Sequence, residues 1–453
     1  MHRNFFKSCR AVLSLAGVLV VAQGVSAQDL GVKAPKQGQP IVINGATLHT
    51  VTGPTIEHGY LVINNGLIRA MGAGDAPPLP MAQIIDATGK HVYPGLIGAD
   101  TIMGLTEIGA VRATIDSAET GDITPEVRAA VAVNPDSTII PVTRLNGILT
   151  CGVLPQGGAI PGRAAVIRMD GWTWEDLAID ADAGLVVNWP NMRPVNAWWM
   201  RSTPEEQLQR AQERLEQIDE MFDAANAYAA ARKADASLPS DIRFEAMGPA
   251  MHGGKPVFIR ANELEQIQSA VSWAERRHLH AVIVGGRDAA KCADMLKRHD
   301  VGVIITGTHR LPGRRDDAYD AAYTLPLQLE EAGVKWCLAS GDETPHERSL
   351  PYQAGLAVAY GLPLEAAVRS VTQSAAELLG VGDRLGSLEP GKAGTIIITD
   401  GNPLDIISQV DMAFIDGRQI DLESKQTVLD EKYREKYRQL GILPSQQGSS
   451  QEH

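Results

Sequence analysis

Three charged residues that could do chemistry each follow a run of mostly apolar or small residues: Asp100, Arg260 and Asp342. A carboxylate in such a place can move a proton, or can bind a divalent metal that activates water. A guanidinium stays protonated and offers a metal no lone pair, so Arg260 favours an ion pair instead. The set therefore predicts either acid–base hydrolysis or a salt bridge, depending on which side chains meet.

The histidines do not form a second metal-binding pattern. Three lie in expected loops, without the short spacing that brings two imidazoles onto one ion: His252, His309 and His346. His278 and His280 stand beside the start of an expected strand, where we expect them to face solvent. Ser340-Gly341-Asp342 is not a nucleophile elbow and has no histidine partner.

Two charge-rich segments are candidates for a pocket that binds a charged small molecule. The first contains Thr106, Glu107, Arg112, Asp116, Glu119, Asp122 and Arg128, and the second contains Arg310, Arg314, Arg315, Asp316 and Asp317. The alternative is a set of solvated loop salt bridges, each of which contributes little stability.

The elements that must position these residues are short apolar runs alternating with helical stretches. The expected strands are His91–Gly98, Ile148–Leu154, Ala164–Met169, Leu185–Asn188, Pro256–Arg260, Ala281–Val284, Gly302–Ile305 and Lys335–Ala339. This alternation predicts an α/β fold, a (β/α)8 TIM barrel, whose site lies at the carboxyl ends of the strands. The pocket candidates at that end are Asp100, Arg260, Asn262, His309 and Arg310, and the candidate catalytic residue is Asp342.

Short β-branched runs with tight turns flank the barrel on both sides, in Ile41–Ile85 and again after residue 384. Neither half has enough strands to close a core alone, so we expect one small composite β-sandwich formed by the N- and C-terminal segments. The expected domains are a sandwich part at 36–90, the barrel at 91–383, and a second sandwich part at 384–422. A C-terminal helix and a disordered tail are expected over 423–453.

Two helices are clearest. One covers Pro204–Lys233, with Thr203 as its cap and a proline in the first turn. It is too long for an ordinary barrel helix, so it is expected to protrude as an insertion or a dimerisation arm. The other covers Leu364–Leu379, just after Pro363.

Three motifs carry a family resemblance. They are Tyr93-Pro94-Gly95-Leu96-Ile97-Gly98-Ala99-Asp100, then Gly386-Ser387-Leu388-Glu389-Pro390-Gly391-Lys392-Ala393, then Asn402-Pro403-Leu404 with Phe414-Ile415-Asp416-Gly417-Arg418. In this order they resemble the amidohydrolase superfamily, in particular its imidazolonepropionase-like and dihydroorotase/hydantoinase-like branch. The resemblance implies hydrolysis of a carbon–nitrogen bond in a small amide or cyclic amide, assisted by one or two divalent metals.

Carried over one position at a time, the metal ligands of that family are largely replaced here. The His-x-His pair falls on Asp100 and Ile102, and the later histidines fall on Arg260 and Gly285. Only the last aspartate is retained, as Asp342. No lysine lies between His91 and Arg232 that could bridge two metals. These replacements therefore predict no cofactor, with zinc or another divalent metal expected only if this interpretation is wrong.

Asp342 has two interpretations. It is a general base or proton shuttle if the site is active, and a cap of the turn into Thr344-Pro345 or the partner of a nearby cation if it is not. Because two carboxylates converging at the mouth would repel without a cation, we expect Arg260 within salt-bridge distance of Asp342, Asp100 or both.

Two functions remain open at this point. The first is a hydrolase of carbon–nitrogen bonds with a weakened site. The second is an inactive relative that binds a small-molecule ligand or pairs with an active paralogue. A homo-oligomer is compatible with either one.

The beginning of the chain and its composition predict the compartment and exclude some partners. Arg3, Lys7 and Arg10 precede the apolar run 11–21 and the small-residue site at 25–27, which is typical of a cleaved signal peptide over 1–27 and of a secreted, periplasmic protein without a stable membrane anchor. The formal charge of -13 disfavours nucleic acid and anionic lipid. The cysteines of the mature chain are expected to be buried, with one pairing left open: Cys151, Cys292 and Cys337.

Overall fold

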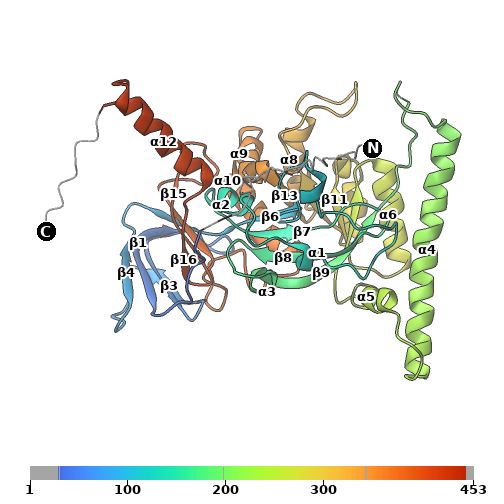
Figure 1. The fold of residues 1–453 in the computed structure, drawn as a ribbon, viewed down its shortest axis with the longest axis horizontal. Helices are drawn as coiled ribbons and strands as arrows, with labels where there is room; N and C mark the ends of the chain where they lie inside the picture. The colour runs from blue at the N-terminus through green and yellow to red at the C-terminus, as the bar shows by residue number, and fades with distance from the viewer. Residues whose placement is uncertain (1–28, 30, 197, 342–343, 445–453) are drawn as a thin grey trace, which may run out of the picture.

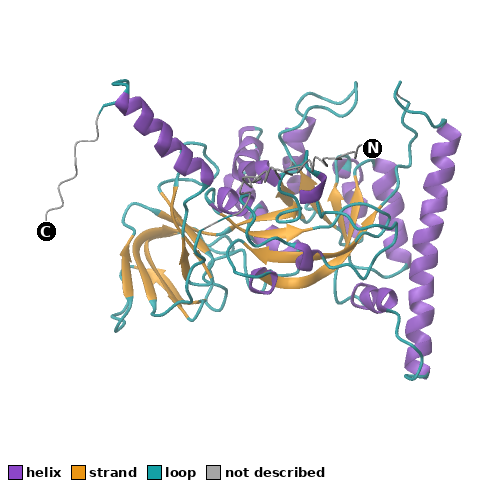
Figure 2. Cartoon of the chain, viewed as in Figure 1, coloured by secondary structure: helices purple, strands orange, loops and turns teal. Residues whose placement is uncertain are grey.

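The computed structural model describes residues 29, 31–196, 198–341 and 344–444. The expected signal peptide at 1–27, Asp342 and the expected tail from 445 onward lie outside the described residues. The described strands form two separate sheets of eight strands each, which Figure 2 shows as two groups of orange arrows.

The first sheet combines both ends of the chain, as the sequence predicts. Its strands are β1 (Ile41–Leu48), β2 (Ile56–Asn64), β3 (Leu67–Ala73), β4 (Gln83–Asp86), β5 (His91–Pro94), β14 (Ile396–Thr399), β15 (Val410–Ile415) and β16 (Arg418–Ile420). They lie in the order β16-β15-β14-β5-β1-β2-β3, with β4 also paired to β1. Blue N-terminal and red C-terminal ribbons therefore lie side by side in Figure 1. The composite sandwich is confirmed.

The tight turns of this sheet follow from residues that tolerate a left-handed backbone. Asn65 and Gly66 join β2 to β3 with φ of 51° and 76°, and Asp416 and Gly417 join β15 to β16 with φ of 49° and 68°. Consecutive positive φ values give turns whose twist matches that of paired strands.

The second sheet is the barrel. Its strands are β6 (Leu96–Thr101), β7 (Ile148–Val153), β8 (Gly162–Arg168), β9 (Ala178–Asn188), β10 (Val257–Ala261), β11 (Ala281–Gly285), β12 (Gly302–Thr306) and β13 (Trp336–Ala339). They follow one another in chain order, and β13 lies beside β6, so the ring nearly closes. Its interior is packed with apolar side chains such as Ala99, Val186, Phe258 and Ile304.

The barrel departs from the expected parallel alternation at its third strand. β8 runs antiparallel to both β7 and β9, and the short helix α3 (Trp174–Leu177) is the only helix between β7 and β9 in the described chain. The expectation of eight parallel strands is wrong here because segments 154–161 and 169–177 are too short. A parallel crossover needs about a dozen residues or more. The loop 154–161 therefore helps to form the barrel mouth.

The expected strand His91–Gly98 is divided between the two sheets. His91–Pro94 pairs with β14 in the sandwich, whereas Leu96 begins the barrel strand beside Ile148. Gly95 stands at the crossing, where a Cβ atom would lie 2.9 Å from Cδ1 of Leu149. The barrel thus begins after Gly95 rather than at residue 91.

Helices cover the outside of the barrel and close its amino end. They are α1 (Ala129–Ala132), α2 (Ile139–Arg144), α5 (Ile242–Met251), α6 (Leu264–Arg276), α7 (Ala293–Arg298), α8 (Ala321–Ala332), α9 (Leu350–Ala359), α10 (Leu364–Ser370) and α11 (Gln373–Leu378), with short 3-10 turns η1 (Arg112–Thr114), η2 (Ala289–Cys292) and η3 (Thr344–Ser349). The single helix expected over 364–379 is broken at Thr372, where φ is -135° and ψ is -97°. The break lets Leu378 of α11 enter the barrel's interior cluster.

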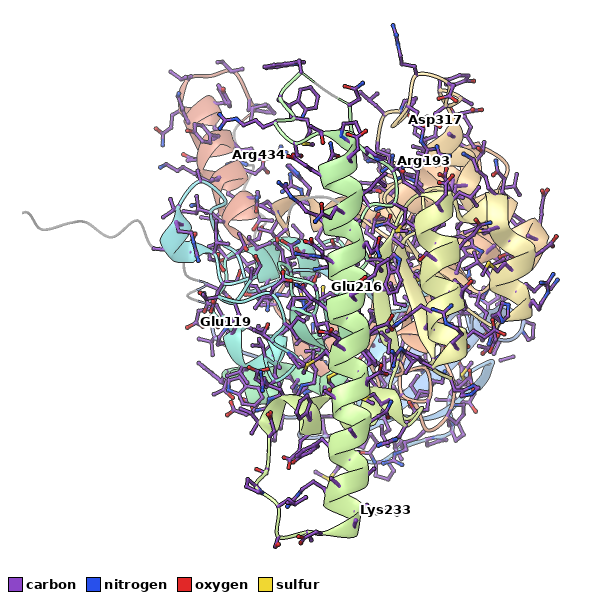
Figure 3. All side chains as sticks on the ribbon, turned by 90° about the vertical axis from the view of Figure 1, so that its right-hand side faces the viewer. Glu119, Arg193, Glu216, Lys233, Asp317 and Arg434 are labelled. Atoms are coloured by element: carbon purple, nitrogen blue, oxygen red, sulfur yellow. The ribbon has the colours of Figure 1, made fainter. Side chains whose placement is uncertain are left out.

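Two long helices reach beyond this layer. α4 (Pro204–Ala234) begins at a capping box of Thr203 and Glu206, as the sequence predicts. It runs down one flank of the molecule, where Figure 3 labels Glu216 and Lys233 along it. α12 (Lys425–Gln439) projects from the sandwich and buries no residue. No described helix is long and apolar enough to cross a membrane.

A buried charge network joins the sandwich to the barrel. The carboxylate of Asp170 accepts from Nη1 of Arg144 at 3.2 Å and from Nη1 of Arg418 at 2.8 Å. The backbone N–H of Ala34 also donates to it, at 3.2 Å. Asp170 and Arg144 are 2% and 3% exposed. One carboxylate therefore bridges two guanidinium groups where β16 meets the barrel.

We expect Asp170→Asn to lower the free energy of unfolding by about 3–5 kcal/mol, because breaking a buried ion pair leaves uncompensated charge. Asp411→Asn is the matched control, since its pair with Lys90 is well exposed and worth less than about 1 kcal/mol. Urea denaturation followed by circular dichroism measures both. Equal losses in the two variants would contradict the role given to Asp170.

A pair of histidines joins β1 to β5 in the sandwich. Nε2 of His49 and Nδ1 of His91 are 3.0 Å apart, and the ring of His49 stacks on Tyr93 with centroids 4.0 Å apart. Burial, followed by the neighbouring His91, lowers the pKa of His49 to about 4, although Glu57 opposes the shift. The folded chain thus favours a neutral His49.

Acidification is expected to weaken the fold through this pair. In the unfolded chain His49 takes up a proton near the ordinary histidine pKa of 6.5, so stability is lost as pH falls from about 6.5 to about 4 and is constant below. Because His49 is partly exposed, we expect a loss of about 1–2 kcal/mol. Urea unfolding across this range should show a flatter profile for His49→Gln than for the exposed-site control His346→Gln. An unchanged profile in His49→Gln would reject the assignment.

Candidate functional site

An ion pair spans the barrel mouth. Nη1 and Nη2 of Arg260, on β10, donate to Oδ2 and Oδ1 of Asp100, on β6, at 3.0 and 2.9 Å. These strands are not neighbours but lie opposite one another in the eight-stranded ring. The bidentate contact therefore crosses the barrel, and the expected pairing of Arg260 with Asp100 is confirmed. The expected pairing with Asp342 falls outside the described residues.

Local backbone structure aims both side chains inward. Phe258 packs in the barrel interior and Ile259 in the outer core, so strand alternation turns Arg260 inward. On β6, the interior residues Ile97 and Ala99 would leave Asp100 facing outward. The β6–β7 register shifts between Gly98 and Thr101, and such a bulge re-aims the following side chain.

The pair is buried on its acidic side and open on its basic side. The side chain of Asp100 is 9% exposed and that of Arg260 is 25% exposed. Nε of Arg260 is buried and has no hydrogen-bond partner among the described atoms. Charge-assisted bidentate contacts of this kind are stronger than neutral hydrogen bonds. Cys337, on β13, has its pKa raised by burial and then by Asp100.

The other positions that would hold a metal in the resembling family do not fit one. Ile102 packs against the core and supplies no ligand. Gly285 has φ of 111°, and a Cβ atom there would lie 2.5 Å from Oδ1 of Asn262. The side chain of Asn262 thus fills the space that a residue larger than glycine would need. In the described residues no group of three His, Cys, Asp or Glu side chains could hold a metal ion.

Glu347 is a buried carboxylate that sequence reasoning missed. It lies in η3, is 1% exposed, and accepts a hydrogen bond from Oγ of Ser340. A Cβ atom on Gly98 would lie 2.3 Å from its Oε1, so Gly98 makes room for it behind β6. The signal was weak because Glu347 follows no apolar run, and only the glycine at 98 marks the space that it occupies.

The remaining candidates do not converge on the mouth. Three of the loop histidines are exposed: His252, His309 and His346. The expected burial of Cys151, Cys292 and Cys337 is confirmed, and all three are free thiols in the described chain. His309 therefore forms no part of a buried site, which corrects its place among the pocket candidates.

The two charge-rich segments line different pockets. Asp116, Glu119 and Arg128 line one of about 420 Å³, whereas Arg310 lines another of about 980 Å³. These two pockets share no lining residue, and the joint polar pocket stays a prediction. Glu107 of the first segment is half-buried, and burial raises its pKa although Ser137, Thr138 and Asn134 oppose the shift.

Asp288 is a second residue that the sequence analysis missed. Burial acts to raise its pKa, but hydrogen bonds from Arg314 and then Lys291 outweigh burial and hold the pKa at about 2. Arg314 binds it through both Nη1 and Nη2. These contacts make Asp288 and Arg314 a structural pair between the loops after β11 and β12.

Comparisons with known proteins agree with this architecture. The profile of the Amidohydrolase family matches residues 286–422. The chain is 24% identical over 403 residues to the amidohydrolase tasK of Hapsidospora irregularis, covering 79% of this chain but 39% of that protein. It is also 24% identical over 381 residues to the imidazolonepropionase of Pseudomonas entomophila, covering 78% of this chain and 90% of that one.

A solved structure shows the same fold. An amidohydrolase from Thermotoga maritima MSB8 aligns with a TM-score of 0.73 at 23% identity, covering 84% of this chain and 99% of that one. This likeness concerns the barrel with its sheet domain.

The contact across the mouth predicts a measurable coupling. Arg260→Ala and Asp100→Ala should each destabilise the chain, and the double variant should lose less than the sum of the two. The expected coupling is about 1.5–3 kcal/mol, the range for charged hydrogen bonds. Urea denaturation of the four proteins measures it. Additive losses would show that the pair contributes no joint stability.

Proposed function

Because this chain belongs to the amidohydrolase superfamily, we propose that it keeps the scaffold of a carbon–nitrogen hydrolase but binds a small ligand at its mouth without a catalytic metal. The observation that carries the proposal is the contact of Arg260 with Asp100. A protonated guanidinium gives a metal no lone pair and repels a cation placed beside it.

The neighbouring positions support the same conclusion. Ile102 supplies no ligand atom, and the space beside Gly285 is filled by Asn262. Replacing one of these residues by histidine would therefore add one metal ligand, whereas a zinc site needs three or four protein ligands. The donor set at the mouth does not fit the divalent metal that the family implies, so no hydrolytic step through a metal is derived.

The mouth can still recognise a ligand. Arg260 is a quarter exposed although both terminal nitrogens contact Asp100. Each terminal nitrogen carries two hydrogens, so the exposed edge can donate to a carbonyl or carboxylate oxygen. A small amide or its carboxylate product suits this arrangement, and the ancestry of the scaffold points to the same chemistry.

The second candidate is a hydrolase with an atypical site, in which Asp342 acts as general base. The observation that favours it is the complete scaffold, because the barrel and the composite sandwich are both present. Fold alone does not establish activity. From the sequence alone, we also propose export to the periplasm and pairing with a paralogue or a second copy.

Metal analysis with a substrate screen tests the proposal. After incubation with zinc and desalting, the wild-type chain should retain less than about one zinc per ten chains, because Arg260, Ile102 and Gly285 supply no ligand at the mouth. It should show no zinc-dependent turnover on small amides and cyclic imides. Mass spectrometry of the bound metal and release of amine are the two readouts.

Two variants calibrate this result. Arg260→His should restore weak zinc binding at most, and Arg260→His combined with Ile102→His should bind more tightly because two imidazoles are added. Circular dichroism checks that both variants fold. Stoichiometric zinc with turnover in the wild-type chain would overturn the proposal in favour of the hydrolase, and turnover without metal would favour an Asp342-based mechanism.

A further inference from the structure

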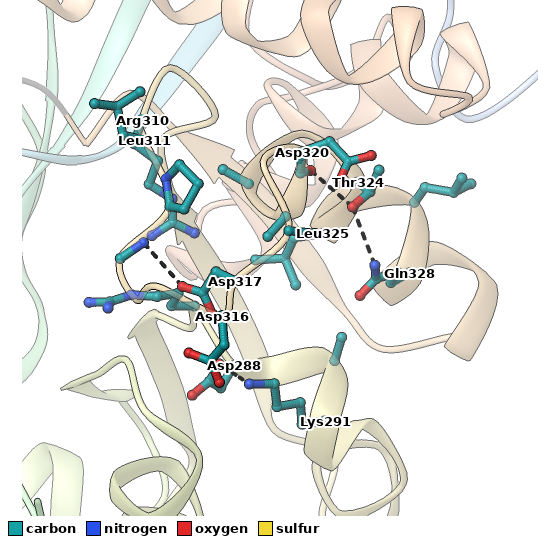
Figure 4. Close-up of a pocket in the computed structure, with 18 residues that line it drawn as sticks. Asp288, Lys291, Arg310, Leu311, Asp316, Asp317, Asp320, Thr324, Leu325 and Gln328 are labelled. Carbon is teal, nitrogen blue, oxygen red and sulfur yellow. Dashed lines mark hydrogen bonds and ion pairs between the residues drawn. The ribbon is translucent and has the colours of Figure 1, made fainter.

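A second polar pocket lies on the rim of the barrel, away from the ion pair of Arg260 with Asp100. It measures about 980 Å³, and its walls come from the segments after β11 and β12 and from helix α8. Figure 4 shows Arg310, Asp317 and Asp288 on one side, with Asp320, Thr324 and Gln328 on the other. Neither Arg260 nor Asp100 lines it. Its size suits a small-molecule ligand.

Two of its cations have no partner within the described chain. Arg287 and Arg310 both line the pocket, and neither forms an ion pair or a side-chain hydrogen bond with a described residue. Arg314 differs, because Asp288, Glu263 and Asp317 surround it. The lack of a described partner is therefore specific to Arg287 and Arg310, since Arg314 of the same region has carboxylate partners.

The positive charge on Arg310 is disfavoured in the folded chain. Burial, and then repulsion from Arg287, lowers the pKa of Arg310, with Asp317 and Asp288 opposing the shift. Arg287 is held against the backbone of the opposite loop, since a Cβ atom on Gly313 would lie 2.5 Å from its Nη1. A partly buried cation that has another guanidinium beside it and no direct ion pair gains from a ligand that brings an anionic group to it.

The opposite wall offers a different chemistry. Thr324 donates to the carbonyl of Asp320 at 3.1 Å and accepts from Nε2 of Gln328 at 3.3 Å. Leu325 and Leu327 of the same helix add apolar surface. A ligand that fills the pocket would thus place an anionic group at the arginines and an amide with an apolar side chain at α8.

We infer that this pocket binds a small carboxylate, of the kind carried by an N-acylated amino acid, with Arg287 and Arg310 holding the carboxylate. A doubly charged phosphate fits less well, because four aspartates also line the pocket: Asp288, Asp316, Asp317 and Asp320. A single negative charge balances the two arginines with less repulsion from those carboxylates. The inference does not depend on the proposed function of the mouth.

Isothermal titration calorimetry with N-acetyl-L-leucine tests the site on the full chain. Arg310→Gln and Arg287→Gln should each weaken binding about tenfold or more, the effect of losing a charged hydrogen bond. The matched control is Arg315→Gln, which removes an exposed cation from the same loop outside the pocket. It should stay within about twofold of the wild type. N-acetyl-L-leucine amide, which lacks the carboxylate, should not bind.

Thermal unfolding separates a binding role from a structural one. Arg310→Gln should leave Tm unchanged or higher, because it removes a poorly compensated cation, while a structural arginine would lower it. N-acetyl-L-leucine should raise Tm of the wild type and not of Arg310→Gln. A binding event that persists in Arg260→Ala and is lost in Arg310→Gln separates this site from the mouth. Unchanged binding in Arg310→Gln, equal weakening in Arg315→Gln, or tighter binding of inorganic phosphate would overturn the assignment.

Discussion

A single guanidinium–carboxylate contact closes the carboxyl end of this barrel. Arg260 and Asp100 come from opposite strands of the ring, so their two hydrogen bonds set the distance across the mouth. The contact depends on a bulge in β6 that turns Asp100 inward and on strict alternation in β10. It also decides the chemistry of the site. A guanidinium in this place has no lone pair to offer a metal, and its exposed edge can still donate to a ligand.

Among the described residues, buried cations in structural regions have carboxylate partners, whereas Arg287 and Arg310 in the proposed binding pocket do not. Arg418 and Arg144 share Asp170 where the sandwich meets the barrel, and Arg314 is neutralised by Asp288 between two loops. These contacts hold elements together and give each of these cations a carboxylate partner. Arg287 and Arg310 lack such partners among the described residues, although they line a pocket. A ligand that neutralises such a charge stabilises the folded chain, because it removes an unfavourable interaction.

The two sheets are connected in a way that couples the sandwich to the mouth. Pro94 pairs with Ile396 in the sandwich, and two residues later Leu96 enters the barrel strand that carries Asp100. At the other end of the barrel, Leu378 enters the interior from a helix that precedes the return of the chain to β14. Leu378 of α11 therefore helps to fill the amino end, and the ion pair of Arg260 with Asp100 lies at the carboxyl end.

The sequence by itself determined the architecture, because the hydrophobic period, the turn residues and the helix caps are local features of the chain. Apolar runs placed the barrel strands, the first of them only in part, Asn65-Gly66 marked a hairpin, and Thr203 marked the start of α4. It also predicted Arg260 within salt-bridge distance of Asp342, Asp100 or both, since charge balance at a common mouth requires a cation there, and the contact with Asp100 is confirmed. Only the tertiary structure decided the direction of β8, the break at Thr372, the burial of Glu347 and the separation of the two charge-rich segments. Each of these depends on loop length or on neighbours distant in the chain, and no local pattern encodes which distant residues will meet.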